Sequence, residues 1–150
     1  MLGGHKLRIS EMELCYTDLD WFAIDKNKKI MCFTSGGYGN VPEFVCASKE
    51  NTDLLSEFFE NAHDCTTAIM VQDEEFGGNL DYWRAASQKG LYCFDAVDGQ
   101  DDTHSYIKIS VPEQPLYFHE LPPHIQSIIE TNFVDTDADT ADTIIVDHAY

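Results

Sequence analysis

Basic residues are scarce in this sequence. Lys and Arg number nine against 27 Asp and Glu in 150 residues, so the formal net charge at pH 7 is −18. Residues 1–49 hold six acidic and six basic residues, residues 50–108 hold 13 and three, and residues 109–150 hold eight acidic residues and no Lys or Arg. Such a field repels nucleic acids and anionic membranes and attracts basic proteins. We therefore expect a basic protein partner, no nucleic acid and no membrane; the alternative is an acidic surface that serves only solubility.

Long apolar runs are also absent. No stretch approaches the roughly 20 apolar residues that a membrane-spanning helix needs. The N-terminal sequence MLGGHKLRIS lacks the apolar core of a signal peptide. We therefore expect a cytoplasmic protein. Apolar residues make up 43% of the chain, which is enough for one hydrophobic core at this length.

Paired cysteines are missing. The sequence has an odd number of cysteines and no C-x-x-C pair; the five are Cys15, Cys32, Cys46, Cys65 and Cys93. In a chain expected in the cytoplasm, this pattern favours reduced thiols over a disulfide framework. Since Cys32 and Cys93 fall in apolar segments expected to be core strands, we interpret the cysteines as structural.

Catalytic and metal-binding signatures are incomplete. There is no G-x-S-x-G, and none of the six histidines lies in a known nucleophile context. Residues 119–124 (HELPPH) resemble a zinc-protease motif, but the histidines are five apart rather than four, and two prolines block a helix. Residues 135–140 (DTDADT) begin like a calcium loop, yet Thr140 replaces its glycine and Val146 its bidentate acid. We predict no catalytic residue, metal or cofactor; weak cation binding at residues 135–140 stays open.

A glycine-rich loop and two acidic turns are the candidate contact sites. Residues 36–39 (GGYG) follow a predicted strand, as phosphate-binding loops do, but no G-x-G-x-x-G is completed and no lysine closes a P-loop. The loop is either a structural turn or a recognition loop that presents Tyr38, because exposed aromatics are favoured contact residues. The predicted partner-binding set is Tyr38 as an anchor, with Asp73, Glu74, Glu75, Asp98, Asp101 and Asp102 as steering charge.

The segment at residues 20–42 organises the predicted fold. Residues 21–25 and 30–34 are apolar on both faces, which predicts a β-hairpin of inner strands covered on both sides. The intervening turn contains Asn27, which tolerates a left-handed backbone. Three glycines then let the chain turn away from the hairpin.

Apolar periodicity predicts three helices. The first begins at Ser48 and carries an apolar stripe at three- and four-residue spacing that includes Leu54 and Phe58. The second runs from Asn79 to Lys89 and is ended by Gly90. The third begins at Pro122 and buries a stripe that extends to Phe133.

Further strands are predicted at 44–46, 66–71, 91–96, 105–111 and 116–118, and residues 7–14 form a strand or a short helix. Alternation in 105–111 places Ile107, Ile109 and Val111 on a buried face and Tyr106, Lys108 and Ser110 on the other face. The prediction is an α+β fold with a mainly antiparallel sheet, an N-terminal β-hairpin and about three helices packed on it. Residues 1–134 form one domain, and residues 135–150 form an acidic C-terminal tail in which 144–146 are either a short edge strand or mobile.

The stretches DWFAIDKNKKIMCFTSGGYGNVP, GLYCFDA and YIKISVPEQPLYFHELPPHIQSII, with the acidic helix after Ser48, carry a resemblance over about residues 19–130. The chain resembles small, acidic, uncharacterised bacterial α+β proteins of the kind that occur as immunity proteins of polymorphic toxin systems. The resemblance implies cytoplasmic inhibition of a toxin by direct binding, without catalysis, and transfers no functional residue. The alternatives are an enzyme whose metal or nucleotide site is assembled only in the fold, and a structural or regulatory interaction module. The oligomeric state is not set by the sequence.

Overall fold

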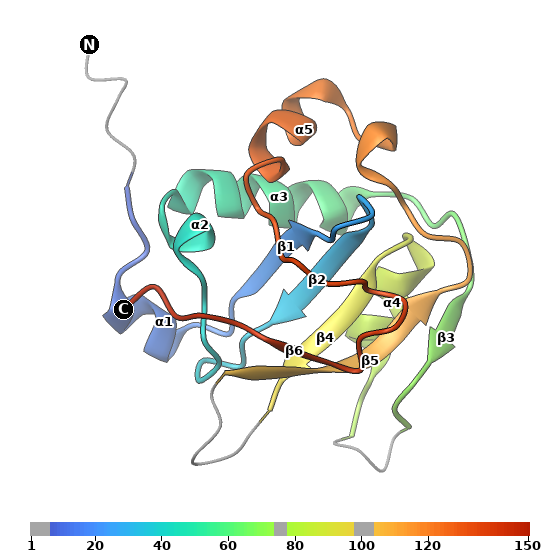
Figure 1. Ribbon diagram of the computed structural model, residues 1–150, viewed down its shortest axis with the longest axis horizontal. Helices are drawn as coiled ribbons and strands as arrows, with labels where there is room; N and C mark the ends of the chain where they lie inside the picture. Colours follow the sequence, from blue (N-terminus) through green and yellow to red (C-terminus); the bar gives the residue numbers. More distant parts are fainter. Residues whose placement is uncertain (1–6, 74–77, 98–103) are drawn as a thin grey trace.

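The computed structural model describes residues 7–73, 78–97 and 104–150, and its centre is a curled, six-stranded mixed sheet (Figure 1). The strands follow the order β1-β2-β4-β5-β3, and β6 pairs with the first residues of β5, on the side where β3 pairs with its last residues. Their bounds are β1 Asp20–Ile24, β2 Ile30–Thr34, β3 Ala68–Met70, β4 Tyr92–Ala96, β5 Ser105–Pro112 and β6 Thr143–Ile145. Of these six strands, only β2 and β4 pair in parallel. The predicted α+β class with a mainly antiparallel sheet is confirmed.

Three main helices accompany the sheet, as predicted: α3 Lys49–Asn61, α4 Asp81–Gln88 and α5 Pro123–Ile129. Two short helices, α1 Glu11–Tyr16 and α2 Glu43–Cys46, and a 3₁₀ turn, η1, at Phe118–Glu120 complete the set of described helices. The hydroxyl of Ser48 accepts a hydrogen bond from the Asn51 amide at 3.2 Å, which caps α3. Asn79 Oδ1 accepts one from the Asp81 amide at 2.8 Å at the start of α4. Gly90, at φ 94°, ends α4 in a conformation that favours glycine.

The β1–β2 hairpin is buried on both faces, as its sequence predicted. Its turn differs from the prediction, because Lys28 adopts the left-handed backbone (φ 69°) and Asn27 does not. The carboxylate of Asp25 explains this choice. Its Oδ1 accepts hydrogen bonds from the amides of Asn27 at 2.9 Å and Lys29 at 2.8 Å, so the chain must reverse between these two residues.

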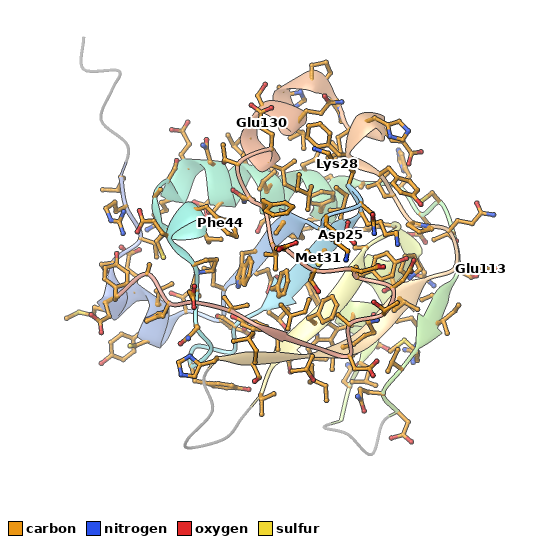
Figure 2. The ribbon with its side chains drawn as sticks, viewed as in Figure 1. Asp25, Lys28, Met31, Phe44, Glu113 and Glu130 are labelled. Carbon is orange, nitrogen blue, oxygen red and sulfur yellow. The ribbon has the colours of Figure 1, made fainter. Side chains whose placement is uncertain are left out.

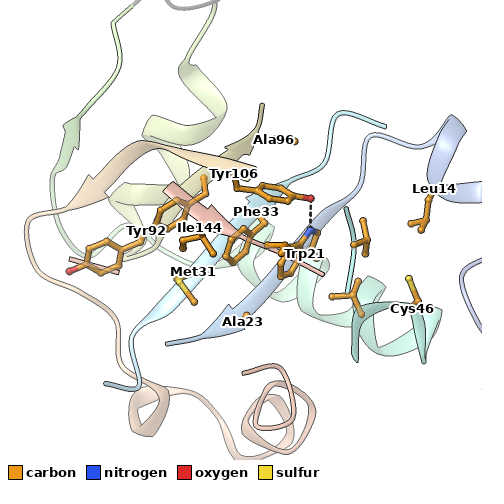
Figure 3. Packing of buried hydrophobic residues seen from close by; sticks show 14 of the residues in the cluster. Leu14, Trp21, Ala23, Met31, Phe33, Cys46, Tyr92, Ala96, Tyr106 and Ile144 are labelled. Atoms are coloured by element: carbon orange, nitrogen blue, oxygen red, sulfur yellow. Dashed lines mark hydrogen bonds between the residues drawn. The ribbon is translucent and has the colours of Figure 1, made fainter. Parts of the chain in front are cut away.

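Separate groups of elements cover the two faces of the sheet. One face carries Trp21, Phe33 and Tyr106 and packs against α1, α2 and the C-terminal segment, residues 135–150, which is red in Figure 1. The rings of Trp21 and Phe33 stack at 4.0 Å in the centre of this cluster (Figure 3). The other face carries Phe22 and Cys32 and packs against α3, α4 and α5. The continuous apolar runs of the hairpin reflect this double cover.

Strand β5 departs from the predicted one-faced alternation. Tyr106, Lys108 and Ser110 are all buried, although the pattern predicted them on an open face. Phe94 pairs with Lys108 and Cys93 with Ser110, so a β-bulge adds Ile109 between the two pairs and shifts the alternation by one residue. The C-terminal segment then covers Tyr106, and α4 covers Ser110, whose hydroxyl lies 2.7 Å from that of Ser87.

Other local predictions also require correction. Residues 44–46 lie in helix α2, not in a strand, because Pro42 precedes a helical turn. Residues 116–118 form one isolated bridge, between Lys29 and Tyr117, and then enter η1. Leu54 is 41% and Phe133 48% exposed, because α3 presents Leu54 outward and α5 ends at Ile129 before it reaches Phe133. Residues 7–14, left open as strand or helix, include the start of α1, which has a capping box between Ser10 and Glu13.

The C-terminal segment is attached by contacts with the buried Lys29 and Lys108 as well as by β6. The ammonium group of Lys29 pairs with Asp139 and lies 3.4 Å from Asp137 Oδ1. The hydroxyl of Tyr92 also donates to Asp139, and Lys108 Nζ donates to the Asp139 carbonyl at 3.0 Å. Asp25, labelled in Figure 2, accepts the Ala138 amide at 2.8 Å. Carboxylates of the calcium-loop-like sequence therefore face lysine ammonium groups.

Two further sequence expectations concern membranes and thiols. Within residues 7–73, 78–97 and 104–150, no helix combines the length and the apolar character needed to cross a bilayer. All five cysteines have free thiols; Cys32, Cys46 and Cys93 are buried, whereas Cys15 and Cys65 are exposed. The predicted placement of Cys32 and Cys93 in core strands is confirmed.

Candidate functional site

The C-terminal ends of two central strands lie at the same edge of the sheet. Because β2 is parallel to β4, the chain leaves this edge after Thr34 and after Ala96. Strand β3 points the same way, since β3 and β4 are both antiparallel to β5, but it ends at Met70 opposite Ser110, and β6 pairs with the remainder of β5 up to the edge. The predicted partner-binding residues follow β2, β3 and β4 in the sequence, and the structure describes Tyr38 and Asp73 among them. We call the edge after Thr34 and Ala96 the exit edge.

Tyr38 lies in the loop that follows β2. Gly36 and Gly37 adopt φ values of 63° and 83°, which bend the loop back over the sheet. The amide of Gly36 donates to Asp18 Oδ1 at 3.0 Å, and the Tyr38 hydroxyl donates to the Ala96 carbonyl at 3.3 Å. The Tyr38 residue is still 41% exposed. Tyr38 is thus held through its loop and through its hydroxyl, and part of its ring is exposed to solvent.

The same loop is joined to β5 and to the C-terminal segment by Asn40, which sequence reasoning did not single out. The Asn40 carbonyl accepts a hydrogen bond from Tyr106 at 2.6 Å. Its side-chain amide nitrogen lies 2.7 Å from His104 Nδ1 and donates to the Val146 carbonyl at 2.9 Å. Asn40 is buried, so this polar side chain works as an internal link. Its position after G-Y-G was the one sequence signal available.

The acidic members of the predicted set are only partly described. Asp73 is exposed and follows Gln72, whose amide donates to the Ile109 carbonyl at 3.1 Å. Strands β4 and β5 lie between the strand that precedes Tyr38 and the strand that precedes Asp73. The remaining predicted contact residues lie outside the described residues: Glu74, Glu75, Asp98, Asp101 and Asp102.

A groove between α3 and α4 is the second notable site, and the sequence did not indicate it. The groove has a volume of about 320 Å³ and lies over β1. Its floor is apolar and includes Phe22, Phe59 and Leu91, each no more than 3% exposed. Polar side chains, among them Asp20 and Tyr82, contribute to its walls. An apolar cavity with a few converging polar groups is the usual form of a small-molecule site.

Asp20 gives this groove its electrostatic character. The carboxylate is half-buried, and Oδ2 accepts a hydrogen bond from the Tyr82 hydroxyl at 2.7 Å. Burial raises the pKa of Asp20, and the negative charges of Asp18, Asp95 and Glu60 raise it further, while the bond from Tyr82 opposes the rise. A positively charged group next to Asp20 would therefore stabilise its ionised form. The only feature of the sequence that pointed to Asp20 was its position directly before the apolar run of β1.

The buried Cys32 thiol beneath Tyr82 is a poor nucleophile. Cys32 and Cys93 are direct neighbours on β2 and β4. The hydrogen bond with Cys93 and burial both raise the pKa of Cys32, so this thiol stays protonated at neutral pH. Ser87 and Ser110 surround Cys93 with hydroxyl groups, and Cys93 Sγ donates to the Trp83 carbonyl at 3.7 Å. These contacts fit packing and hydrogen bonding inside the core.

His104, His119 and His148 make separate contacts. His104 bonds to Asn40, and His148 Nδ1 accepts the Val41 amide at 3.0 Å. His119 stacks on Tyr117 with ring centres 5.8 Å apart. Among the residues that the structure describes, no group of three or more His, Cys, Asp or Glu is arranged to hold a metal ion.

Comparisons of the chain with protein-family models, with curated proteins and with solved structures gave no match. Function is therefore inferred from the geometry and charge of the described residues.

Proposed function

We propose that this protein is a non-enzymatic binding protein that attaches to a basic protein domain in the cytoplasm and neutralises a toxin, as an immunity protein does. The observation that carries the proposal is the exit edge, where the part-exposed Tyr38 follows β2 and is held against the end of β4. The toxin-binding role rests on the resemblance of the sequence to immunity proteins, and the basic nature of the partner rests on the net charge of −18.

The charge supports fast recognition of a basic partner. Complementary fields steer diffusing proteins together and raise their association rates above those of neutral pairs. Oriented encounter matters for an inhibitor because it must reach the toxin before the substrate does. A negative surface also competes with a polyanionic substrate for a cationic groove, which is the feature expected of a nuclease-like toxin.

Tyr38 supports specific attachment after the encounter. Its hydroxyl is held by Ala96 and its loop by Asp18, so little side-chain entropy is lost when a partner covers the ring. Partly exposed tyrosines on rigid supports are typical interface anchors. We assign Tyr38 the role of anchor, with Asp73 as part of the surrounding charge.

The test mixes the protein with the toxin domain encoded immediately upstream of its gene, in low salt, and measures the complex by size-exclusion chromatography and calorimetry. Tyr38→Ala is expected to weaken binding about tenfold or more, which corresponds to about 1.4 kcal/mol. Phe133→Ala is the matched control, because Phe133 is 48% exposed and lies beside Ile24, at the end of the hairpin opposite to Thr34 and the Tyr38 loop. Co-expression should rescue growth of cells that make the toxin. Absence of such a gene, of a complex or of rescue overturns the proposal, and equal losses in the two variants remove Tyr38 from it.

A further inference from the structure

We infer that the groove between α3 and α4 binds a small organic ammonium cation that carries an apolar body. The cavity of about 320 Å³ lies at the lower end of the range of ligand pockets. It corresponds to the liquid volume of about ten water molecules. This room suits one ring with a short aminoalkyl chain.

The floor of the groove matches the apolar part of such a ligand. Phe22 from β1 and Phe59 from α3 pack with their ring centres 4.7 Å apart, and Leu91 lies beside them. Water on this floor has few polar partners, so its displacement by an apolar group is favourable. The ring of Tyr82 adds an aromatic face on the α4 side, and aromatic faces attract cations.

The carboxylate of Asp20 matches the ammonium group. Tyr82 binds Oδ2, and Asp20 Oδ1 has no hydrogen-bond or ion-pair partner among the residues that the structure describes. The neighbouring charges that act on Asp20 are those of Asp18, Asp95 and Glu60, which are all negative. A cation at Oδ1 relieves this repulsion, whereas an anion adds to it. The site therefore selects by charge sign as well as by size.

Lys89 lines the groove but does not pair with the negative charge of Asp20. Its ammonium group donates to the carbonyls of Phe59 at 2.9 Å and Glu60 at 2.8 Å. Both carbonyls belong to the last turn of α3, where the helix dipole is negative. Lys89 thus caps α3 and closes one end of the groove, and the open carboxylate remains that of Asp20.

The experiment titrates the full chain with 2-phenylethylammonium, with the neutral isostere 2-phenylethanol and with the anion phenylacetate, at neutral pH and low salt. Binding is followed by calorimetry and by NMR shifts of residues that line the groove, such as Ser56 and Ala85. We expect the ammonium ion to bind at least tenfold more tightly than the alcohol, and phenylacetate to bind most weakly.

Two variants of equal charge change separate a local site from the general acidic field. Asp20→Asn is expected to abolish the preference for the ammonium ion while it keeps binding of the alcohol. Asp53→Asn, on the exposed side of α3, is expected to keep the tenfold preference. Ala85→Phe fills the groove from α4 and should abolish binding of both compounds, with circular dichroism as the check on folding.

Three results overturn the inference: equal affinities for the ammonium ion and the alcohol, equal losses of preference in Asp20→Asn and Asp53→Asn, or shifts that fall outside the groove. The toxin-binding role is tested separately, because its anchor Tyr38 does not line the groove. Failure of one proposal leaves the other standing.

Discussion

At the scale of single residues, one hydroxyl group connects the core to the candidate contact loop. The Tyr106 hydroxyl accepts a hydrogen bond from Trp21 Nε1 at 3.2 Å, drawn as the dashed line in Figure 3, and donates to the Asn40 carbonyl at 2.6 Å. Trp21 and Tyr106 are both 0% exposed, so neither the indole N–H nor the carbonyl has water as a ready substitute. The position of the Tyr38 loop thus depends on a residue of β5 far from it in the sequence.

Tyr106→Phe should destabilise the protein by about 1–3 kcal/mol, because it leaves a buried indole donor without an acceptor. Urea denaturation followed by Trp fluorescence measures the change in the free energy of unfolding. Tyr16→Phe removes an exposed hydroxyl and serves as the control with no expected change. Equal unfolding midpoints for the two variants would show that the buried hydrogen bonds contribute little.

Asp20 is expected to reduce stability at neutral pH. Burial raises its pKa in the folded state above the unfolded value of about 3.9. Its contribution to stability is therefore fully present below the unfolded pKa and is lost as the pH rises through the folded pKa. Asp20→Asn removes this loss and retains an acceptor for the Tyr82 hydroxyl.

Asp20→Asn should accordingly raise the Tm by a few degrees at pH 7, and the gain should shrink as the pH approaches about 4. Differential scanning calorimetry across this pH range measures the effect, with Asp53→Asn as the variant of equal charge change at an exposed position. A gain that is the same at both pH values would contradict the burial argument.

At the scale of elements, the C-terminal segment is the clearest case of an element that depends on distant partners. It combines strand β6 with charge contacts from Lys29, Tyr92 and Lys108. Adjacent residues of β6 have opposite environments, since Ile144 is 4% and Ile145 66% exposed. The segment therefore completes the core on one face of the sheet.

Ile144→Ala should cost about 2–5 kcal/mol, because it removes buried methyl groups and leaves a cavity beside Tyr106 and Phe33. Ile145→Ala is the matched control and should change stability by less than about 0.5 kcal/mol. Chemical denaturation of both variants measures the change in the free energy of unfolding. Similar small losses would mean that β6 is attached only loosely to the sheet.

At the scale of the whole molecule, self-repulsion among carboxylates opposes folding. A net charge of −18 in 150 residues is far from zero, and compact states concentrate that charge. Exposed ion pairs such as Arg8–Glu43 and Lys49–Glu13 offset only part of it, because surface pairs contribute little. The same charge is what steers a basic partner in the proposed function.

Raising the NaCl concentration from about 0.01 M to about 0.15 M shortens the screening length from about 30 Å to about 8 Å. At pH 7 this screening should raise the Tm and slow association with a basic partner. Near the isoelectric point of about 4.3 the effect on the Tm should vanish, which provides the control within the same protein. A Tm that falls with salt at pH 7 would show that specific ion pairs dominate over repulsion.

The candidate sites were only partly predictable. The glycine-rich neighbourhood of Tyr38 indicated the candidate loop at the exit edge, and the acidic turn after β3 indicated Asp73. The groove could not be predicted, because Asp20 and Tyr82 are 62 residues apart and meet only when α4 packs near β1. The burial of Lys108 on β5 was missed for the same reason, since its cover comes from residues 139–142.

By itself, the sequence determined the elements whose causes are local: the apolar hairpin, the capped helix after Ser48, the stop at Gly90 and the start of α5 at its prolines. It also determined the net charge. The tertiary structure alone decided the strand order, the bulge in β5, the cover of one sheet face by the C-terminal segment and the open carboxylate of Asp20. The physical reason is that caps, turns and periodicity act within a few residues, whereas burial and pKa depend on which distant segments come to lie together.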